Sequence, residues 1–255
     1  ALTQRFWPGP LTVVARRSAV VPDAVTAGLD TVAVRLPAHA AARPIIRAAG
    51  VPLAAPSANL SGSPSPTTAQ HVLRDMDGRI DAVADGGACE VGVESTIVDM
   101  SERPFRLLRP GGITPEQLRE VLGDYVTDRA VTQSIPEGER VRAPGMKYRH
   151  YAPRAPLTAV CGEARKSAAY IRGVLFEGCA VLCFDGYESF FGCPSVSYGA
   201  ETDAGEQARR LYGALRELDA LCPAKIFAQC AETGGMGFAV FNRVGKAAGF
   251  DVVRV

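Results

Sequence analysis

Short apolar runs separated by turn residues fill the first half of the chain. Four runs have the length and aliphatic content of strands: residues 11–14, 31–36, 96–99 and 105–108. Two further runs, 51–55 and 80–84, are also predicted as strands. Pro52 restricts the first of them to an edge, a bulge or the beginning of a strand. The pattern predicts a sheet of short strands.

Capping residues mark three helices between these runs. A helix over 43–49 is predicted to end at Gly50. Thr67 with Gln70 has the spacing of a capping box at the start of a second helix. Thr114 followed by Pro115 is the favoured opening of a third, which Gly123 ends.

The second half returns to a regular strand–helix alternation. Strands are predicted at 157–160, 180–184, 226–229 and 252–253, and helices at 163–171, 203–221 and 238–248. Leu211, Leu215, Leu218 and Leu221 form the apolar stripe of the longest helix. This alternation predicts a small α/β domain. Between the halves, residues 124–155 lose periodicity, and the stretch 142–156 is unusually aromatic and basic for a spacer.

Composition narrows the class of protein. The 255 residues are 47% hydrophobic and carry 28 Lys+Arg against 27 Asp+Glu, a net charge of +1. This balanced charge disfavours a protein that binds nucleic acid or a membrane surface with its whole chain. No apolar run approaches the ~20 residues that a membrane-spanning helix needs. The seven cysteines form no Cys-x-x-Cys pair, which makes a zinc site a poor interpretation. Free thiols in a reducing cytoplasm are expected instead.

Several polar residues follow apolar runs and are candidates for chemistry. Ser57, Asn59 and Ser65 lie in a Gly/Pro-containing stretch that is either a phosphate cradle or a solvated loop. Arg35 and Arg109 interrupt or end apolar strands, so each either recognises an anion or extends into solvent. Ser95, taken alone, is most simply a strand-edge residue. Gly235-Met236-Gly237 is interpreted as a tight entry into the last helix rather than a dinucleotide site.

Longer strings carry a family resemblance. Arg5-Phe6-Trp7-Pro8-Gly9-Pro10-Leu11-Thr12 resembles the opening motif of the YrdC-like family, and so do Val34-Arg35-Leu36-Pro37, Pro56-Ser57-Ala58-Asn59-Leu60-Ser61-Gly62, Glu94-Ser95-Thr96-Ile97-Val98 and Arg109-Pro110-Gly111-Gly112-Ile113. The run 143–153 resembles the linker of the long, two-domain form, and 235–243 resembles part of its extra domain. The resemblance covers essentially the whole chain.

The resemblance implies a threonylcarbamoyl-adenylate synthase, which is a nucleotidyltransferase. Such enzymes condense L-threonine, bicarbonate and ATP, with Mg²⁺ on the phosphates, and release pyrophosphate. Partner proteins then transfer the threonylcarbamoyl group to an adenosine beside the tRNA anticodon. The implied fold is a twisted mixed α/β sheet followed by a small Rossmann-like domain. A cytoplasmic location is expected, with no membrane attachment and no stable direct nucleic-acid binding.

Residue roles carry over by the same resemblance. Three residues would serve threonine: Arg35 on its carboxylate, with Ala55 and Ser95 shaping the pocket. The ATP site would be lined by Thr31, Ser57, Asn59, Ser65, Arg109 and Tyr148. Within this set, Asn59 would support the segment that carries Ser57. His150 would order the linker as a lid over the nucleotide.

The same resemblance implies domain boundaries, and an alternative function stays open. We expect a YrdC-like domain over 1–124, a linker and lid over 125–156, and a Rossmann-like domain over 157–255. The family's Lys-x-Arg element, which precedes its opening motif, does not lie within these residues. The first domain is therefore expected to be incomplete at its N-terminus. The alternative function is a non-catalytic RNA-binding or regulatory module.

Overall fold

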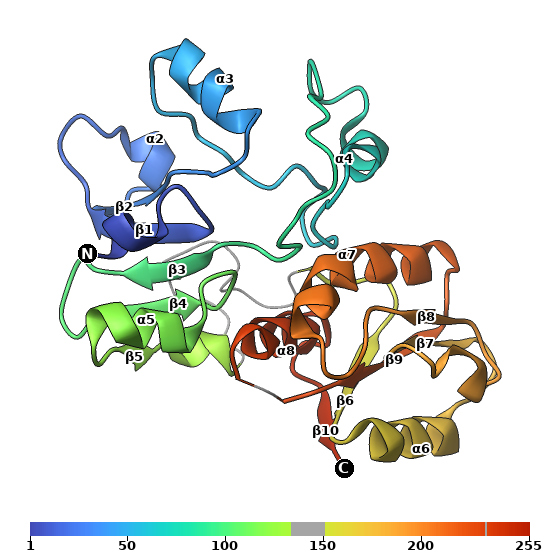
Figure 1. Ribbon diagram of the computed structural model, residues 1–255. Coiled ribbons are helices and arrows are strands. Elements are labelled where there is room, and N and C mark those ends of the chain that lie inside the picture. The colour runs from blue at the N-terminus through green and yellow to red at the C-terminus, as the bar shows by residue number, and fades with distance from the viewer. Residues whose placement is uncertain (134–150, 233) are drawn as a thin grey trace. The chain divides into compact units, whose positions relative to one another are not determined.

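The computed structural model describes residues 1–133, 151–232 and 234–255 (Figure 1). Contacts divide the chain into two compact units. Within the described residues, the first unit contains 1–56 and 94–133, and the second contains 57–93 and the residues from 151 onward. The expected contiguous boundaries at 124 and 156 remain a prediction. A segment that lies before residue 124 in sequence nevertheless packs with the later half.

The first unit is built on a five-stranded mixed sheet. Its strands are β1 (Leu11–Arg16), β2 (Thr31–Arg35), β3 (Thr96–Asp99), β4 (Arg106–Arg109) and β5 (Val126–Thr127), in the order β2-β1-β3-β4-β5. Strand β1 runs antiparallel to β2 and parallel to β3, whereas β3 and β4 are antiparallel and β4 and β5 parallel. Val14, Ile97, Leu108 and Ala130 form a buried cluster on this sheet. The predicted twisted mixed sheet is confirmed.

Short helices lie between and beside the strands of the first unit. They are α1 (Leu2–Phe6), α2 (Asp23–Thr26), α3 (Ala42–Ala49), α5 (Pro115–Leu122) and the 3₁₀ turn η1 (Arg129–Val131). The predicted start of α5 is confirmed: Thr114 and Gln117 form a reciprocal capping box with Pro115 at the first helical position. Gly50 ends α3 in the left-handed conformation, as expected.

The second unit contains a five-stranded, fully parallel sheet. Strands β6 (Leu157–Cys161), β7 (Cys179–Cys183), β8 (Ser195–Ser197), β9 (Lys225–Cys230) and β10 (Val252–Arg254) lie in the order β10-β6-β9-β7-β8. Helices α6 (Ala164–Val174), α7 (Ala204–Ala220) and α8 (Met236–Ala247) and the turn η2 (Glu188–Phe190) connect them. In Figure 1, α6 lies on one face of this sheet, and α7 and α8 lie on the other. This is the predicted Rossmann-like arrangement.

Alternating side chains bury both faces of this parallel sheet. In β7, Ala180 and Leu182 join one apolar cluster with α7 and α8, while Val181 joins a second cluster with Ile171 of α6. In β9, Ala228 belongs to the first cluster in the same alternating way. Strands buried on both faces need continuous apolar sequence. This explains why most strands of the parallel sheet could be predicted from apolar runs.

The segment 57–93 joins the second unit through α4 (Ala69–Met76) and the residues that flank it. Val93 is buried in the same apolar cluster as α7 and α8. Gly92 lies against the backbone of Ala208 and Arg209 in α7, where a Cβ would collide with both residues. This close approach explains why position 92 carries no side chain.

Four local predictions were wrong. Residues 51–55 and 80–84 form no strand, because neither run pairs with a strand in the described residues, and Val51 and Ile80 stay exposed. The cap of α4 is Thr68, which accepts from the His71 N–H, and not Thr67. Leu221 follows the end of α7 and is 52% exposed, so the buried stripe stops at Leu218.

Candidate functional site

The first unit contains a buried hydroxyl pair tied to an arginine. Ser95 immediately precedes β3, and its Oγ lies 2.7 Å from Oγ1 of Thr12 in β1. Arg109, the last residue of β4, donates from Nε to the Ser95 carbonyl at 3.1 Å and from Nη2 to the Ser95 Oγ at 3.2 Å. Two predicted site residues, Ser95 and Arg109, therefore lie together. Thr12 was not predicted, although it is part of the opening motif.

Backbone packing fixes this arrangement. The Thr96 hydroxyl donates to the Ile113 carbonyl at 2.7 Å and accepts from the Ile113 N–H at 2.9 Å. Gly111 lies so close to this turn that a Cβ would be 2.5 Å from the Thr96 nitrogen and 2.6 Å from the Ser95 carbonyl carbon. A side chain at 111 would displace the residues that hold Arg109, so glycine is required there.

The charge of Arg109 is held in place by Ser95, and no carboxylate in the described part of the chain neutralises it. The guanidinium is half-buried and uses two of its five N–H groups on Ser95. The other three have no partner, and no carboxylate pairs with Arg109, among the residues the structure describes. A fixed, partly desolvated guanidinium with open donors is suited to binding a carboxylate or a phosphate.

The remaining predicted residues of the first unit lie at different places. Arg35 ends β2 and lies opposite Thr12 in the strand register. Arg35 is therefore at the end of the β1–β2 pair that carries the Thr12–Ser95 hydroxyl pair. Thr31 begins β2 and pairs with Arg16, about 13 Å further along the strand at the usual rise per residue. Ala55 is exposed in an irregular stretch after α3.

Ser57, Asn59 and Ser65 belong to the second unit, in a stretch we call the Ser57–Ser65 loop. The Asn59 amide nitrogen donates to the carbonyls of Leu60 at 2.9 Å and Ser63 at 3.2 Å, so this side chain braces the loop's own turn. Asn59 Oδ1 is buried with no partner in the described residues. Ser57 is exposed, whereas Ser65 is only 7% exposed. Tyr148 and His150 lie outside the described residues.

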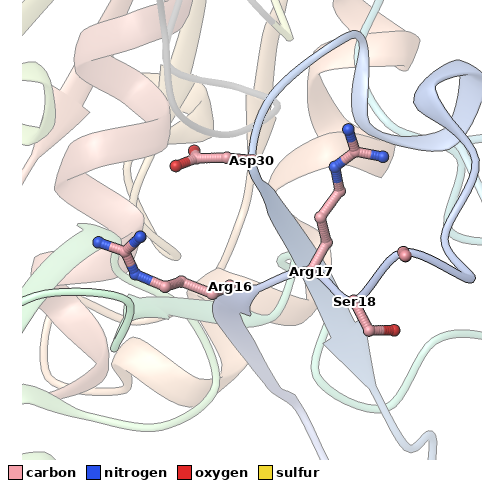
Figure 2. A pocket seen from close by; sticks show the side chains of 5 residues that line it. Arg16, Arg17, Ser18 and Asp30 are labelled. Atoms are coloured by element: carbon pink, nitrogen blue, oxygen red, sulfur yellow. The ribbon is translucent and has the colours of Figure 1, made fainter.

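A cavity of about 490 Å³ lies at the far end of the β1–β2 hairpin (Figure 2). Arg16, Arg17, Ser18 and Asp30 line it. Its arginines are already engaged: Arg17 pairs with Asp23 at 2.6 Å, and Arg16 lies 3.6 Å from Glu102. The only predicted site residue next to it in sequence is Thr31. This cavity offers no free cation comparable to Arg109.

The described part of the chain shows neither a metal-ligand cluster nor a membrane-spanning helix. No group of three or more His, Cys, Asp or Glu side chains is placed to hold a metal ion there. No helix there is both long enough and apolar enough to cross a bilayer. Among the free cysteines, Cys89 and Cys222 are exposed, and burial raises the pKa of the Cys183 thiol to about 12.

Comparisons with known proteins find relatives along the whole chain. Residues 1–111 match the family described as "Telomere recombination", and 113–249 match "Threonylcarbamoyl-AMP synthase, C-terminal domain". The chain is 44% identical to the threonylcarbamoyl-AMP synthase of Pyrococcus abyssi, over 100% of the chain and 74% of that protein. It is 42% identical to the Bacillus subtilis enzyme of the same name, over 99% and 73%. It resembles the crystal structure of P. abyssi Sua5 complexed with L-threonine with a TM-score of 0.92 at 42% identity, covering 100% of this chain and 74% of that one.

Proposed function

Because this chain belongs to the threonylcarbamoyl-AMP synthase family, we propose that it condenses L-threonine, bicarbonate and ATP into threonylcarbamoyl-AMP and pyrophosphate. Two relatives that match the chain almost from end to end carry that name. A similar structure was solved with L-threonine bound, which supports threonine as one substrate. Seven free cysteines are consistent with a reducing cytoplasm as the place of action.

The proposed reaction has two parts. The threonine amine first takes up bicarbonate as a carbamate, with loss of water. A carbamate oxygen then attacks the α-phosphorus of ATP, forming the P–O bond of a mixed anhydride while the bond to pyrophosphate breaks. The protein forms no covalent bond in this scheme. Its task is to place two anionic groups in line and to stabilise the charge that develops between them.

One observation carries the proposal: Arg109, the predicted ATP residue, donates two hydrogen bonds to Ser95, the predicted threonine residue. The attacking and attacked groups must meet, and this contact joins the residues assigned to each. A hydroxyl has one proton and two lone pairs. With one lone pair occupied by Arg109 and one site by Thr12, the Ser95 hydroxyl keeps one position for threonine.

We assign the other residues within this scheme. Arg35 would hold the threonine carboxylate, with Ala55 beside the substrate. Thr31, Ser57, Asn59 and Ser65 would contact ATP or support its binding loop, and Tyr148 and His150 would cover the nucleotide. The product would pass to proteins that modify the adenosine beside a tRNA anticodon.

Mg²⁺ is proposed to arrive as the complex with ATP. The hydroxyls and guanidinium of Thr12, Ser95 and Arg109 supply no carboxylate ligand, and the described residues hold no three-ligand cluster. Mg²⁺ commonly takes most of its ligands from phosphate and water, so a protein cage is not required. The ion would supply charge neutralisation at the phosphates.

The assignment of Arg109 is tested by calorimetry with Arg109→Met. We expect the Kd for Mg-ATP to rise by about tenfold or more, because charge-assisted hydrogen bonds contribute about 1.5–3 kcal/mol. Arg106→Met is the matched control. Arg106 lies on the same strand, and its nitrogen is 3.9 Å from Asp128, so this variant should bind Mg-ATP normally. Normal Mg-ATP affinity in Arg109→Met would show the ATP assignment to be wrong.

A further inference from the structure

A buried ion pair connects α7 to the segment that carries the Ser57–Ser65 loop. Arg216 of α7 donates to Asp75 of α4, from Nη1 to Oδ1 at 3.0 Å and from Nη2 to Oδ2 at 2.6 Å. The two side chains are 7% and 9% exposed. The hydrogen bond from Arg216 holds the pKa of Asp75 below its ordinary value, so the carboxylate stays charged.

The same guanidinium also reaches the loop itself. Nη2 of Arg216 donates to the Pro64 carbonyl at 2.6 Å, and this carbonyl belongs to the residue directly before Ser65. The Gly62 carbonyl accepts from the Ala152 N–H at 3.1 Å. With the two internal bonds of Asn59, the loop is held at Leu60, Gly62, Ser63 and Pro64.

Stability alone does not account for an arginine at this position. A buried ion pair is often replaced by apolar residues without loss of stability, because removing two charges from water offsets their attraction. Arg216 Nε is also buried with no partner in the described residues, which adds to the cost. What an apolar residue cannot do is donate to the Pro64 carbonyl and fix the loop in one conformation.

We propose that Arg216 is a positioning residue that holds the Ser57–Ser65 loop in the conformation that binds ATP. The Rossmann-like part of the chain thereby organises a nucleotide-binding element that precedes it in sequence. This inference rests on the proposed function, because it requires the loop to contact ATP. It adds a role for α7, which none of the predicted site residues occupies.

Two variants separate positioning from stability. Arg216→Met removes the contact to Pro64 and leaves Asp75 unpaired, so both folding and binding should suffer. Asp75→Leu/Arg216→Met replaces the whole pair by apolar side chains and leaves no unpaired charge, so it should melt well above Arg216→Met. It should still melt below the unsubstituted chain, because the buried Pro64 carbonyl has lost its donor. It also lacks the Asp75 carboxylate, which accepts a backbone hydrogen bond from Leu60 of the same loop, so the variant tests the ion pair as one unit. We expect its Kd for Mg-ATP to rise by about tenfold, with faster amide hydrogen exchange in residues 58–65.

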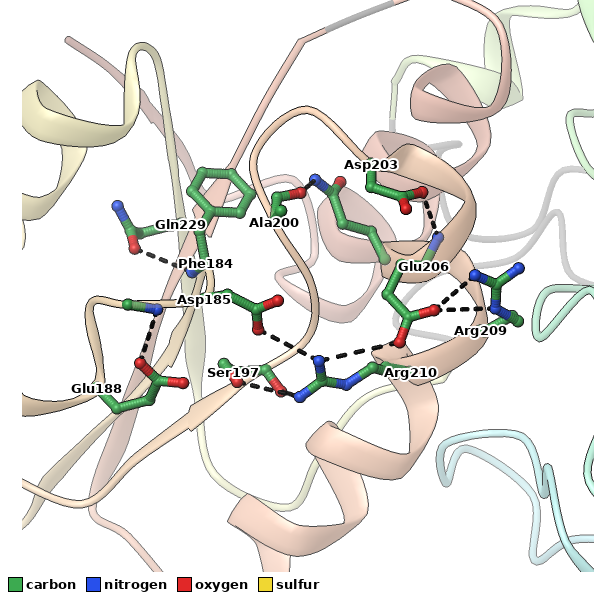
Figure 3. Close-up of polar contacts among 12 residues, drawn as sticks. Phe184, Asp185, Glu188, Ser197, Ala200, Asp203, Glu206, Arg209, Arg210 and Gln229 are labelled. Carbon is green, nitrogen blue, oxygen red and sulfur yellow. Dashed lines mark hydrogen bonds and ion pairs between the residues drawn. The ribbon is translucent and has the colours of Figure 1, made fainter.

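Arg210→Met is the matched control on the same helix. Arg210 pairs with Asp185 at 3.2 Å and donates to the Ser197 carbonyl at 2.9 Å (Figure 3), and neither partner belongs to the Ser57–Ser65 loop. This variant should change neither the Kd for Mg-ATP nor exchange in the loop. The Kd for L-threonine should stay the same in every variant, because Arg35, Ala55 and Ser95 are not touched.

The outcomes distinguish the two proposals. If the unsubstituted chain binds Mg-ATP and the apolar double variant binds it equally well, the positioning role is wrong and the proposed function stands. If the double variant melts above Arg216→Met and still loses affinity for Mg-ATP but not for threonine, the role is supported. If neither the unsubstituted chain nor a version extended by the family's Lys-x-Arg element binds Mg-ATP, the proposed function fails and this inference fails with it.

Discussion

Arg109 and Arg216 are both held by forked hydrogen bonds, yet their surroundings suit them to different tasks. Arg216 faces the carboxylate of Asp75 and a backbone carbonyl, so its charge is matched within the protein. Arg109 faces a serine and keeps three N–H groups without a partner in the described residues. Arg216 therefore stabilises the fold through a matched charge, whereas Arg109 can bind an external anion.

His71 gives a pH-dependent prediction at the residue scale. Burial, followed by the charges of Arg216 and Arg74, lowers its pKa below 6.5, while Asp75 opposes the shift. Below pH 6.5 the unfolded chain therefore binds more protons than the folded chain. The stability that His71 contributes is full above 6.5 and is lost as the pH falls through the folded pKa. The melting temperature should decline over that window, and His71→Asn should flatten the decline.

Asparagine is chosen because its side-chain oxygen can still accept from the Thr67 N–H, as His71 Nδ1 does at 3.2 Å. A His71→Asn profile as steep as that of the unsubstituted chain would contradict this account.

Single residues show how far the sequence can locate a site. Ser95 and Arg109 were predicted as site residues, and the structure joins them directly. Thr12 was not predicted as a site residue. Its partner Ser95 is 83 residues away in sequence, and nothing local marks a threonine in an apolar strand as having a buried contact. Thr31 could be placed on β2 by its pattern, but only the strand register shows that it lies at the opposite end from Arg35.

At the scale of elements, apolar periodicity located helices better than it located their ends. It placed α7 correctly and assigned four leucines to its buried stripe. The last of these, Leu221, lies beyond the final turn, where the chain has left the helix. The two false strands failed for a related reason, because an apolar run becomes a strand only where another strand is available to pair with it.

The apolar stripe of α7 gives a prediction at the scale of elements. Leu215→Ala should lower the free energy of unfolding by about 2–5 kcal/mol, because the side chain is fully buried between α7 and the sheet. Leu221→Ala should change it by no more than about 0.5 kcal/mol, since Leu221 is 52% exposed. Urea denaturation of the two variants measures both values. Equal losses would mean that Leu221 is buried after all.

At the scale of the whole molecule, the chain is organised by contacts between distant residues. Arg216 and Asp75 are 141 residues apart, and their pairing is one reason why 57–93 packs with the later half. No local pattern encodes such a contact, so sequence reasoning divided the chain into contiguous pieces. The fold class of each part was predicted, because periodicity located most of the strands and the family resemblance implied how they are arranged. The short strands β5 and β8 were not predicted.

The most direct test of the account is a product assay. The chain, and a version extended by the family's Lys-x-Arg element, would be incubated with ATP, Mg²⁺, L-threonine and isotopically labelled bicarbonate. Mass spectrometry would then detect the nucleotide products. The account predicts threonylcarbamoyl-AMP that carries the bicarbonate label, formed by at least the extended protein and strongly reduced by Arg109→Met. No labelled adenylate from either protein, with both shown to be folded, would contradict it.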